Sequence, residues 1–221
     1  MCESVIQKTF AESGPIAKQF KNYSVRNQQV KLSEAIYDSY QSGTNLLAEA
    51  PTGIGKSMAG LVAAHSQSGK VLIATATKAL QEQYFNKDMP FMQKVFGDSF
   101  TYSMLKGRSN YVCLKRLAEF KQAPLKVNWS QELKAMIKHQ LQVITKWLQT
   151  DPRGDMDSLS FNLLPEIRNA ICSSADDCDG KKECPFAKNN TCPYYKNKTQ
   201  AESTKVVLVK RIISGRNKYV Y

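Results

Sequence analysis

The residue types best placed to do chemistry form a glycine-containing loop that ends at Lys56 and Ser57. The loop reads Ala-Pro-Thr-Gly-Ile-Gly-Lys-Ser, which follows the pattern G-x-x-x-x-G-K-[ST] with alanine at the first glycine position. We expect Gly53 and Gly55 to turn successive backbone N–H groups toward phosphate oxygens. In this pattern the lysine contacts the β- and γ-phosphates and the hydroxyl group binds magnesium. The spacing therefore predicts a site for a nucleoside triphosphate, ATP, together with Mg²⁺.

The whole loop is predicted to surround the phosphates, with Lys56 and Ser57 as the catalytic residues. Its members are Ala50, Pro51, Thr52, Gly53, Ile54, Gly55, Lys56 and Ser57. The alternative is an ordinary glycine-rich turn between a strand and a helix that contains Gly-Lys-Ser by chance. The flanking segments favour the phosphate site, because an apolar segment precedes the loop and a helical pattern follows it, as the mechanism requires.

The cysteines are the second group of chemically capable residues. The chain has six, at Cys2, Cys113, Cys172, Cys178, Cys184 and Cys192. The last three lie within fifteen residues, and together with the distant Cys113 they supply four thiolates. Four thiolates suit either a tetrahedral zinc ion or a [4Fe–4S] cluster. The short C-x₂₋₄-C hooks of structural zinc sites are absent, which favours the cluster and leaves zinc as an alternative.

The predicted metal ligands are therefore Cys113, Cys178, Cys184 and Cys192. A third alternative is that these are buried, inert cysteines, which is the usual role of an isolated one. A polar, lysine-rich loop is a poor place for several such residues. We assign the inert role only to Cys2 and Cys172.

The charge of the chain points to an anionic partner. The formal net charge is +12, and the segment from Lys181 to Tyr221 carries ten lysines and arginines against two acids. A solvated, lysine-rich surface would account for the total charge, but the concentration of charge favours a binding surface. Nucleic acid is the polyanion we expect first.

No apolar stretch predicts a membrane segment. None reaches the roughly 18 residues needed to span a bilayer, and the first twenty residues lack the apolar core of a secretory signal. We therefore predict a cytoplasmic protein without a membrane partner.

An alternation of strands and helices must position these residues. The predicted elements are, in order, a helix over 27–42, a strand over 45–48, a helix over 57–66, a strand over 70–75, a helix over 78–92 and a strand over 101–105. We expect Gly43 to end the first helix and Pro90 to loosen the third. This alternation predicts an α/β fold, a parallel sheet covered by helices.

The pattern changes after Leu105. Three further helices are predicted, over 112–121, 130–150 and 159–172, the last interrupted at Pro165, and a cysteine-rich loop follows them. The next apolar segment, Lys205–Val209, predicts a strand that returns to the sheet. The predicted domains are thus residues 1–105, a mostly helical insertion over 106–204, and a strand with a basic tail over 205–221.

Five segments, taken together and in order, resemble the XPD/DinG family of iron–sulfur, superfamily 2 DNA helicases. They are Arg26-Asn27-Gln28-Gln29, Glu49–Ser57, Thr75–Gln83, Lys106–Cys113, and the cysteine segments at Cys178, Cys184-Pro185-Phe186 and Cys192-Pro193-Tyr194-Tyr195. The resemblance runs from about Tyr23 to Val209. The phosphate loop alone is common to many NTPases, whereas the combination is specific.

The resemblance implies a RecA-like motor domain with a [4Fe–4S] insertion beside the junction of a forked DNA. Arg26 and Gln29 stand at the positions that read adenine, and Thr75–Gln83 at the segment that contacts single-stranded DNA. Metal–thiolate bonds would make the insertion rigid. The tyrosines that are candidates for base contact, or alternatively for packing, are Tyr102, Tyr111, Tyr194 and Tyr195.

The chain also departs from the family pattern. The family needs an Asp-Glu-Ala-His motif at the end of a later strand, and no apolar strand after Ser57 ends in Asp-Glu. After Val209 the sequence continues with Lys210-Arg211 and stops at Tyr221, without a second motor domain. We therefore expect the first part of a helicase, as a frameshifted fragment, a split gene with a partner chain, or a retained module.

The function expected from the resemblance is ATP-dependent 5′-to-3′ DNA unwinding in repair or replication. The alternative from another class is a non-catalytic module that binds ATP and single-stranded DNA and requires a second chain. A third alternative is a zinc-stabilised nucleic-acid-binding protein with a vestigial phosphate loop. The two histidines, His65 and His139, are read as ordinary helix residues.

Overall fold

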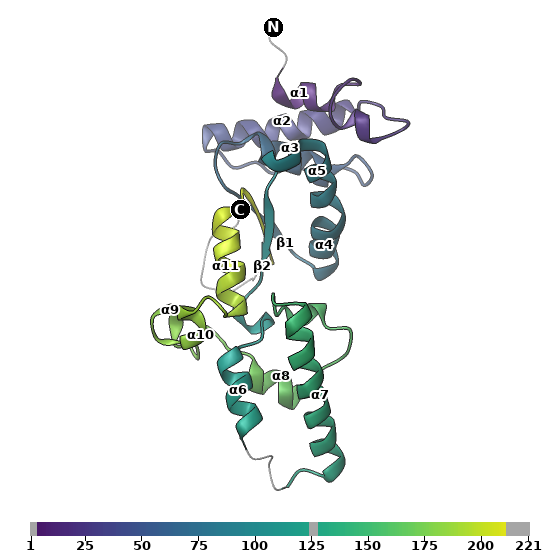
Figure 1. The fold of residues 1–221 in the computed structure, drawn as a ribbon. Coiled ribbons are helices and arrows are strands. Elements are labelled where there is room, and N and C mark those ends of the chain that lie inside the picture. The colour runs from purple at the N-terminus through teal and green to yellow at the C-terminus, as the bar shows by residue number, and fades with distance from the viewer. Residues whose placement is uncertain (1–3, 124–127, 211–221) are drawn as a thin grey trace. The chain divides into compact units, whose positions relative to one another are not determined.

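The computed structural model describes residues 4–123 and 128–210. The chain divides into two compact units (Figure 1). The first, called the sheet unit, comprises Met1–Leu105 and Ser203–Tyr221, and the second, called the helical unit, comprises Lys106–Glu202. Each unit has its own hydrophobic core.

The sheet unit contains a three-stranded parallel sheet. Its strands are β1 (Val71–Thr75), β2 (Tyr102–Leu105) and β3 (Val206–Lys210), in the order β1-β3-β2. Val206 pairs with both Val71 and Tyr102, so β3 is the middle strand. An apolar run such as Val-Val-Leu-Val is typical of a strand buried on both faces. The prediction of an α/β fold with a parallel sheet is confirmed.

Helices pack around this sheet. They are α1 (Val5–Phe10), η1 (Ala17–Gln19), α2 (Asn27–Ser42), α3 (Lys56–Ser66), α4 (Lys78–Gln83), η2 (Tyr84–Asp88), α5 (Met89–Phe96) and η3 (Gly97–Ser99). Leu61 and Val62 of α3 pack in the core with Leu208 of β3. Gly43 ends α2 in the left-handed conformation, with a φ of 66°, as its position in the sequence predicted.

The helix predicted over 78–92 forms with a change of pitch in the middle. The turn η2 is π-helical and lies between α4 and α5, ending two residues before Pro90. A proline inside a helix lacks an N–H group and crowds the preceding turn. Pro90 stands in the first turn of α5, where proline is tolerated, so the helical path continues beyond the π turn.

The predicted strand over Asn45–Ala48 is wrong. The segment has no regular secondary structure, and Leu47 is fully exposed. A strand needs a neighbour to bond its N–H and C=O groups. Among the described residues, none of the three strands pairs with this segment.

The helical unit is built around a long amphipathic helix, α7. Its elements are η4 (Arg108–Asn110), α6 (Leu114–Gln122), α7 (Gln131–Thr150), η5 (Met156–Ser158), α8 (Pro165–Ile171), α9 (Gly180–Glu183), α10 (Pro185–Lys188) and α11 (Pro193–Ser203). Ile137, Leu141 and Ile144 point into the core. The predicted helix over 159–172 begins only at Pro165, because proline disfavours helical conformation in the residue before it. Across the described parts of the chain, no helix is long and apolar enough to cross a membrane.

Candidate functional site

Two glycines shape the phosphate loop. Gly53 and Gly55 have φ values of 85° and 87°, a left-handed conformation that other residues rarely adopt. Gly55 directly precedes α3, so the loop leads into the positive end of that helix. A Cβ atom on Gly55 would lie 2.1 Å from Gln29 Nε2, whereas one on Gly53 would meet open space. The loop therefore requires glycine at position 55 for two reasons.

The side chain of Lys56 folds back over its own loop. Its Nζ atom donates hydrogen bonds to the carbonyl oxygens of Ala50 and Pro51, both at 2.8 Å. Lys56 is exposed to solvent. The ammonium group thus has two neutral acceptors. A phosphate is a charged and therefore stronger acceptor, so it would replace these carbonyl oxygens as the partner of Lys56.

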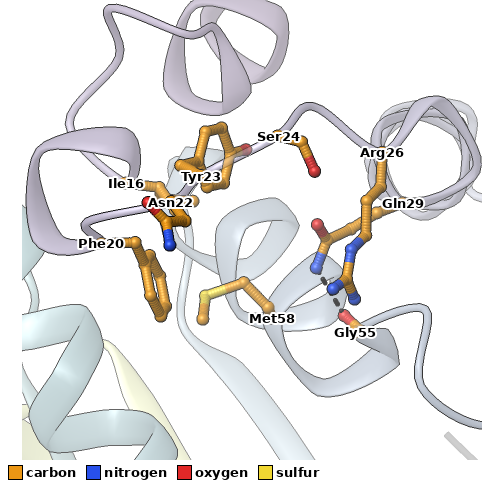
Figure 2. A pocket seen from close by; sticks show the side chains of 9 residues that line it. All are labelled: Ile16, Phe20, Asn22, Tyr23, Ser24, Arg26, Gln29, Gly55 and Met58. Carbon is orange, nitrogen blue, oxygen red and sulfur yellow. Dashed lines mark hydrogen bonds between the residues drawn. The ribbon is translucent and has the colours of Figure 1, made fainter.

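The start of α2 is tied to the same loop. Arg26 Nη1 donates a hydrogen bond of 2.6 Å to the carbonyl oxygen of Gly53, and Gln29 Nε2 donates one of 3.0 Å to that of Gly55. Figure 2 shows both side chains extending to the loop beside Gly55. These two predicted nucleotide-binding residues therefore also hold the two left-handed glycines in place.

A pocket of about 300 Å³ adjoins the loop. Its lining residues are Ile16, Phe20, Asn22, Tyr23, Ser24, Arg26, Gln29, Gly55 and Met58 (Figure 2). The rings of Phe20 and Tyr23 are stacked with centroids 6.2 Å apart, and Phe20 is 48% exposed. A pocket of this size with an accessible aromatic wall can hold a planar heterocycle. Apart from Arg26, Gln29 and Gly55, sequence reasoning missed these residues, although two aromatics just before Arg26 were a signal.

Each predicted metal ligand lies at or just before the start of a helix. Cys113 and Cys184 occupy the N-cap positions of α6 and α10 without a side-chain capping hydrogen bond. Cys192 directly precedes α11, and Cys178 lies two residues before α9. Cys184 is the most buried, with 8% of its surface exposed. Helix N-termini favour the thiolate form of cysteine.

Electrostatic coupling to neighbouring cysteines contributes to the raised pKa of Cys113. Burial raises the pKa of Cys113, the backbone N–H groups of Arg116 and Lys115 oppose the rise, and the charges of Cys192 and Cys184 add to it. Cys113 thus joins the other cysteines although it lies far from them in the sequence.

Cys192 behaves in the same way. Burial raises the pKa of its thiol, the backbone N–H groups of Tyr195 and Tyr194 lower it, and the charges of Cys184 and Cys178 raise it further. A metal ion binds the deprotonated thiolate, so it would have to displace the protons of these thiols. Within the described residues, no three His, Cys, Asp or Glu side chains stand as a ready-made group for one metal ion.

Cys172 lies apart from most of this group. Burial raises the pKa of its thiol, and of the other cysteines only Cys113 contributes to the rise. Cys2, the other cysteine assigned an inert role, lies outside the described residues, as does the basic tail beyond Lys210.

The four candidate tyrosines have different surroundings. Tyr111 is only 3% exposed, and its hydroxyl accepts a hydrogen bond from the Lys106 backbone N–H, so it packs the interior. Tyr102 packs edge-on against Phe85 in the sheet unit. The rings of Tyr194 and Tyr195 are partly exposed.

Arg108 joins the two partly exposed rings. Its guanidinium lies 4.8 Å from the ring centroid of Tyr194 and 5.6 Å from that of Tyr195. Such cation–π contacts fix the segment before the first candidate ligand to the segment after the last.

The Thr75–Gln83 segment spans the end of β1 and all of α4. Thr77 caps α4 by accepting a hydrogen bond from Leu80 N–H at 3.2 Å. Thr75 and Gln81 are buried, and Leu80 is 38% exposed. The segment therefore presents only part of its length to a ligand.

A separate basic groove lies on the helical unit. Its lining residues are Lys121, Lys138, Leu141, Gln142, Thr145 and Lys146. No carboxylate lines the groove, and its three lysines form no ion pair with any described acid. Three unpaired like charges in one groove suit an anionic ligand.

The parallel sheet, the left-handed glycine loop that opens α3 and the adjoining pocket define a P-loop α/β protein. Comparison with known families makes this more specific, because the family described as DEAD/DEAH box helicase matches residues 26–151. That is more than half of the chain, and the chain belongs to this family.

Curated relatives agree with this assignment and confirm the resemblance to DinG-type helicases. The chain is 31% identical over 201 residues to the ATP-dependent DNA helicase YoaA of Escherichia coli K12. The aligned region covers 90% of this chain and 30% of the relative. It is 28% identical over 176 residues to the ATP-dependent helicase DinG of Mycobacterium tuberculosis H37Rv, with 73% and 26% covered. It is 30% identical over 192 residues to the DinG helicase of Photobacterium profundum, with 78% and 26% covered. The chain therefore spans less than a third of the length of these relatives.

Proposed function

We propose that this chain is the ATP- and DNA-binding portion of a DinG-like, ATP-dependent 5′-to-3′ DNA helicase of DNA repair or replication. The observation that carries the proposal is the phosphate loop, with its two left-handed glycines and an exposed Lys56 next to a base-sized pocket. The names of the relatives, ATP-dependent DNA helicases, support the same reading.

In this proposal the loop residues Ala50 to Ser57 surround the triphosphate. Lys56 exchanges two neutral carbonyl partners for phosphate oxygens, a stronger charge-assisted interaction. Ser57 supplies a hydroxyl ligand to Mg²⁺, and the backbone N–H groups after Gly53 neutralise the β-phosphate.

The base would occupy the adjoining pocket. Phe20 offers an accessible ring for stacking, and Arg26 and Gln29 stand where their polar groups meet both the loop and the base. Stacking on one aromatic wall is worth roughly 1–3 kcal/mol, so this pocket would supply a substantial share of the affinity.

Nucleotide binding is tested by titrating the 221-residue chain with a fluorescent ATP analogue in Mg²⁺. We expect saturable binding that falls by at least about 100-fold in Lys56→Ala, because the phosphates lose their only lysine partner in the loop. Lys94→Ala, an exposed lysine elsewhere in the sheet unit, is the matched control. Equal binding by wild type and Lys56→Ala would contradict the site.

For the helical unit we propose a [4Fe–4S] cluster held by Cys113, Cys178, Cys184 and Cys192. The electrostatic coupling of Cys113 and Cys192 to the neighbouring cysteines and the burial of Cys184 support it. A cluster would tie together short helices of four residues that share little core of their own. Anaerobically purified protein should contain iron and acid-labile sulfide, and stoichiometric zinc without sulfide would contradict the cluster.

The nucleic-acid partner we propose is single-stranded or forked DNA, bound mainly through phosphates. The basic groove of the helical unit and the Thr75–Gln83 segment support this part of the proposal. A second chain that supplies further motor elements belongs to the same proposal.

One observation favours binding without turnover for these residues alone. The strand that follows the helical unit, β3, ends at Lys210, and Arg211 comes next in the sequence, so no Asp-Glu pair stands at its end. Hydrolysis in P-loop enzymes uses such a carboxylate on the metal ion. We therefore expect negligible ATPase activity from the 221-residue chain. DNA-stimulated activity that Lys56→Ala removes would contradict this reading.

A further inference from the structure

The accessible wall of the pocket beside the phosphate loop is a single ring on irregular chain. Phe20 directly follows the short helix η1 in an extended conformation, and it is 48% exposed. A ring exposed to this degree can adopt several rotamers unless its neighbours restrict it. The contacts of Phe20 therefore decide whether the wall is in place before a ligand binds.

Two other aromatic rings contact Phe20. The ring centroid of Phe91 lies 5.1 Å from that of Phe20, with an interplanar angle of 41°, and the Tyr23 ring is stacked at 6.2 Å. Both distances lie in the range in which aromatic pairs attract each other. Of the three rings, only Phe20 and Tyr23 line the pocket (Figure 2). Phe91 therefore acts on the pocket through Phe20.

Each of the two supporting rings is itself fixed to the core of the sheet unit. Phe91 lies on α5 next to the fully buried Met92, and its ring packs against the core. The Tyr23 hydroxyl donates a hydrogen bond of 2.9 Å to the carbonyl oxygen of Phe10, a residue that is only 1% exposed. Phe20 is thus held by two side chains that take their places when the unit folds.

We infer that Phe91 is a positioning residue that holds the Phe20 ring in the orientation in which it stacks on the base. The inference rests on the proposed ATP site and adds the way in which its base pocket is pre-organised. A ring that is ordered in advance loses less conformational freedom when the base arrives, so the affinity rises without a further contact. Phe91 therefore contributes to the binding of the base and not to that of the phosphates.

The test uses Phe91→Leu, which removes the ring and keeps a large apolar side chain. Calorimetric titration of the full chain measures its affinity for ATP and for inorganic tripolyphosphate, each in Mg²⁺. ATP binding should weaken roughly 2- to 10-fold, the range set by the freedom that one side chain regains. The affinity for tripolyphosphate should not change, because this ligand has no base to stack on Phe20.

Two further variants make the result specific. In Phe20→Leu the stacking ring is gone, so adding Phe91→Leu to it should not weaken ATP binding further, in a double-mutant cycle. Phe96→Leu is the matched control, because it removes another partly buried ring of α5, one that is stacked on His65. This control should leave both affinities unchanged.

The outcomes separate this inference from the proposed function. A wild-type chain that binds neither ATP nor tripolyphosphate would contradict both the ATP site and the role of Phe91. If the wild type binds ATP, an unchanged ATP affinity in Phe91→Leu would overturn only the role of Phe91. An equal loss for the two ligands, or the same loss of ATP affinity in the Phe20→Leu background, would also overturn that role alone.

Discussion

The phosphate loop of the sheet unit is held in place by its own unit, whereas the cysteines of the helical unit stand at the starts of separate helices. Arg26 and Gln29 fix the loop through two carbonyl oxygens, without any ligand. Around the cysteines, burial and neighbouring thiols raise the pKa values of Cys113 and Cys192. The first site is ready for its ligand, and the second is expected to be completed by one.

The largest effect should come from removing a proposed metal ligand of the helical unit. Cys184→Ser is expected to lose most of the iron and sulfide, because its thiol is the most buried of the four proposed ligands. Cys172→Ser should keep the metal content, since Cys172 neighbours only Cys113. Iron and sulfide assays on anaerobic samples check both variants. Equal metal content in the two variants would contradict the proposal that Cys184 is a metal ligand and Cys172 is not.

The first site can be tested by two glycine substitutions that share a backbone conformation. Gly53→Ala and Gly55→Ala both place an L-residue at a φ near 85°, which costs roughly 1–2 kcal/mol. Only Gly55→Ala also drives a Cβ into the Gln29 side chain. We expect nucleotide affinity to fall about tenfold for Gly53→Ala and further for Gly55→Ala.

Titration with the ATP analogue and Mg²⁺ measures both affinities. Gly60→Ala, which changes a glycine inside α3 where a Cβ meets nothing, is the control. If the Gly55→Ala variant binds nucleotide with the same affinity as the Gly60→Ala variant, the left-handed glycine and its contact with Gln29 do not hold the loop.

A smaller effect is expected from the basic groove. Lys138→Gln with Lys146→Gln removes two charges that line it, on one face of α7. On single-stranded DNA each phosphate contact contributes about −0.7 to the slope of log K against log salt, so the slope should become shallower by about 1.4. Fluorescence anisotropy over a salt series measures it.

The control for the groove removes two exposed lysines of the sheet unit, Lys8→Gln with Lys18→Gln. An unchanged slope in the groove variant, or an equal change in the control, would show that the groove does not bind DNA. If the groove variant lost affinity for polyglutamate and kept it for DNA, the groove would be a site for acidic protein.

The smallest effect concerns the pH dependence of the sheet unit. Burial lowers the pKa of His65, and the positive charge of Lys205, whose Nζ donates to the His65 carbonyl, lowers it further. As the pH falls, the unfolded chain therefore protonates His65 at a higher pH than the folded chain does. Folding stability thus falls as pH drops below about 6.5. The loss should stay under about 1.4 kcal/mol, because the ring is only partly buried and solvent screens it.

Urea unfolding at pH 7.5 and pH 5.5 measures this loss. His65→Phe keeps a ring against Phe96, on which His65 is stacked at 3.9 Å, and removes the titration. It should reduce the difference between the two pH values. An unchanged difference would assign the pH dependence to other groups.

Local patterns in the sequence predicted much of the sheet unit. The helix ended by Gly43, the strands β1 and β2, and the return of the chain as β3 all follow from short-range periodicity and turn residues. The phosphate loop has a fixed spacing that its chemistry demands, so its residues could be named in advance.

The features that escaped prediction depend on partners distant in the sequence. The apolar segment Asn45–Ala48 has the composition of a strand, but among the described residues it has no strand to pair with. The pocket wall at Phe20 and Tyr23 comes from irregular chain without a motif. The π-helical turn over Tyr84–Asp88 is also not revealed by composition alone.

Hydrogen–deuterium exchange with and without a non-hydrolysable ATP analogue and Mg²⁺ tests the central claim most directly. The account predicts protection of the backbone in residues 20–29 and 50–60, because the loop and the pocket beside it close on the ligand. Residues 178–192, which carry three of the proposed metal ligands, should exchange at an unchanged rate. Absence of protection over 50–57, or protection confined to 178–192, would contradict the account.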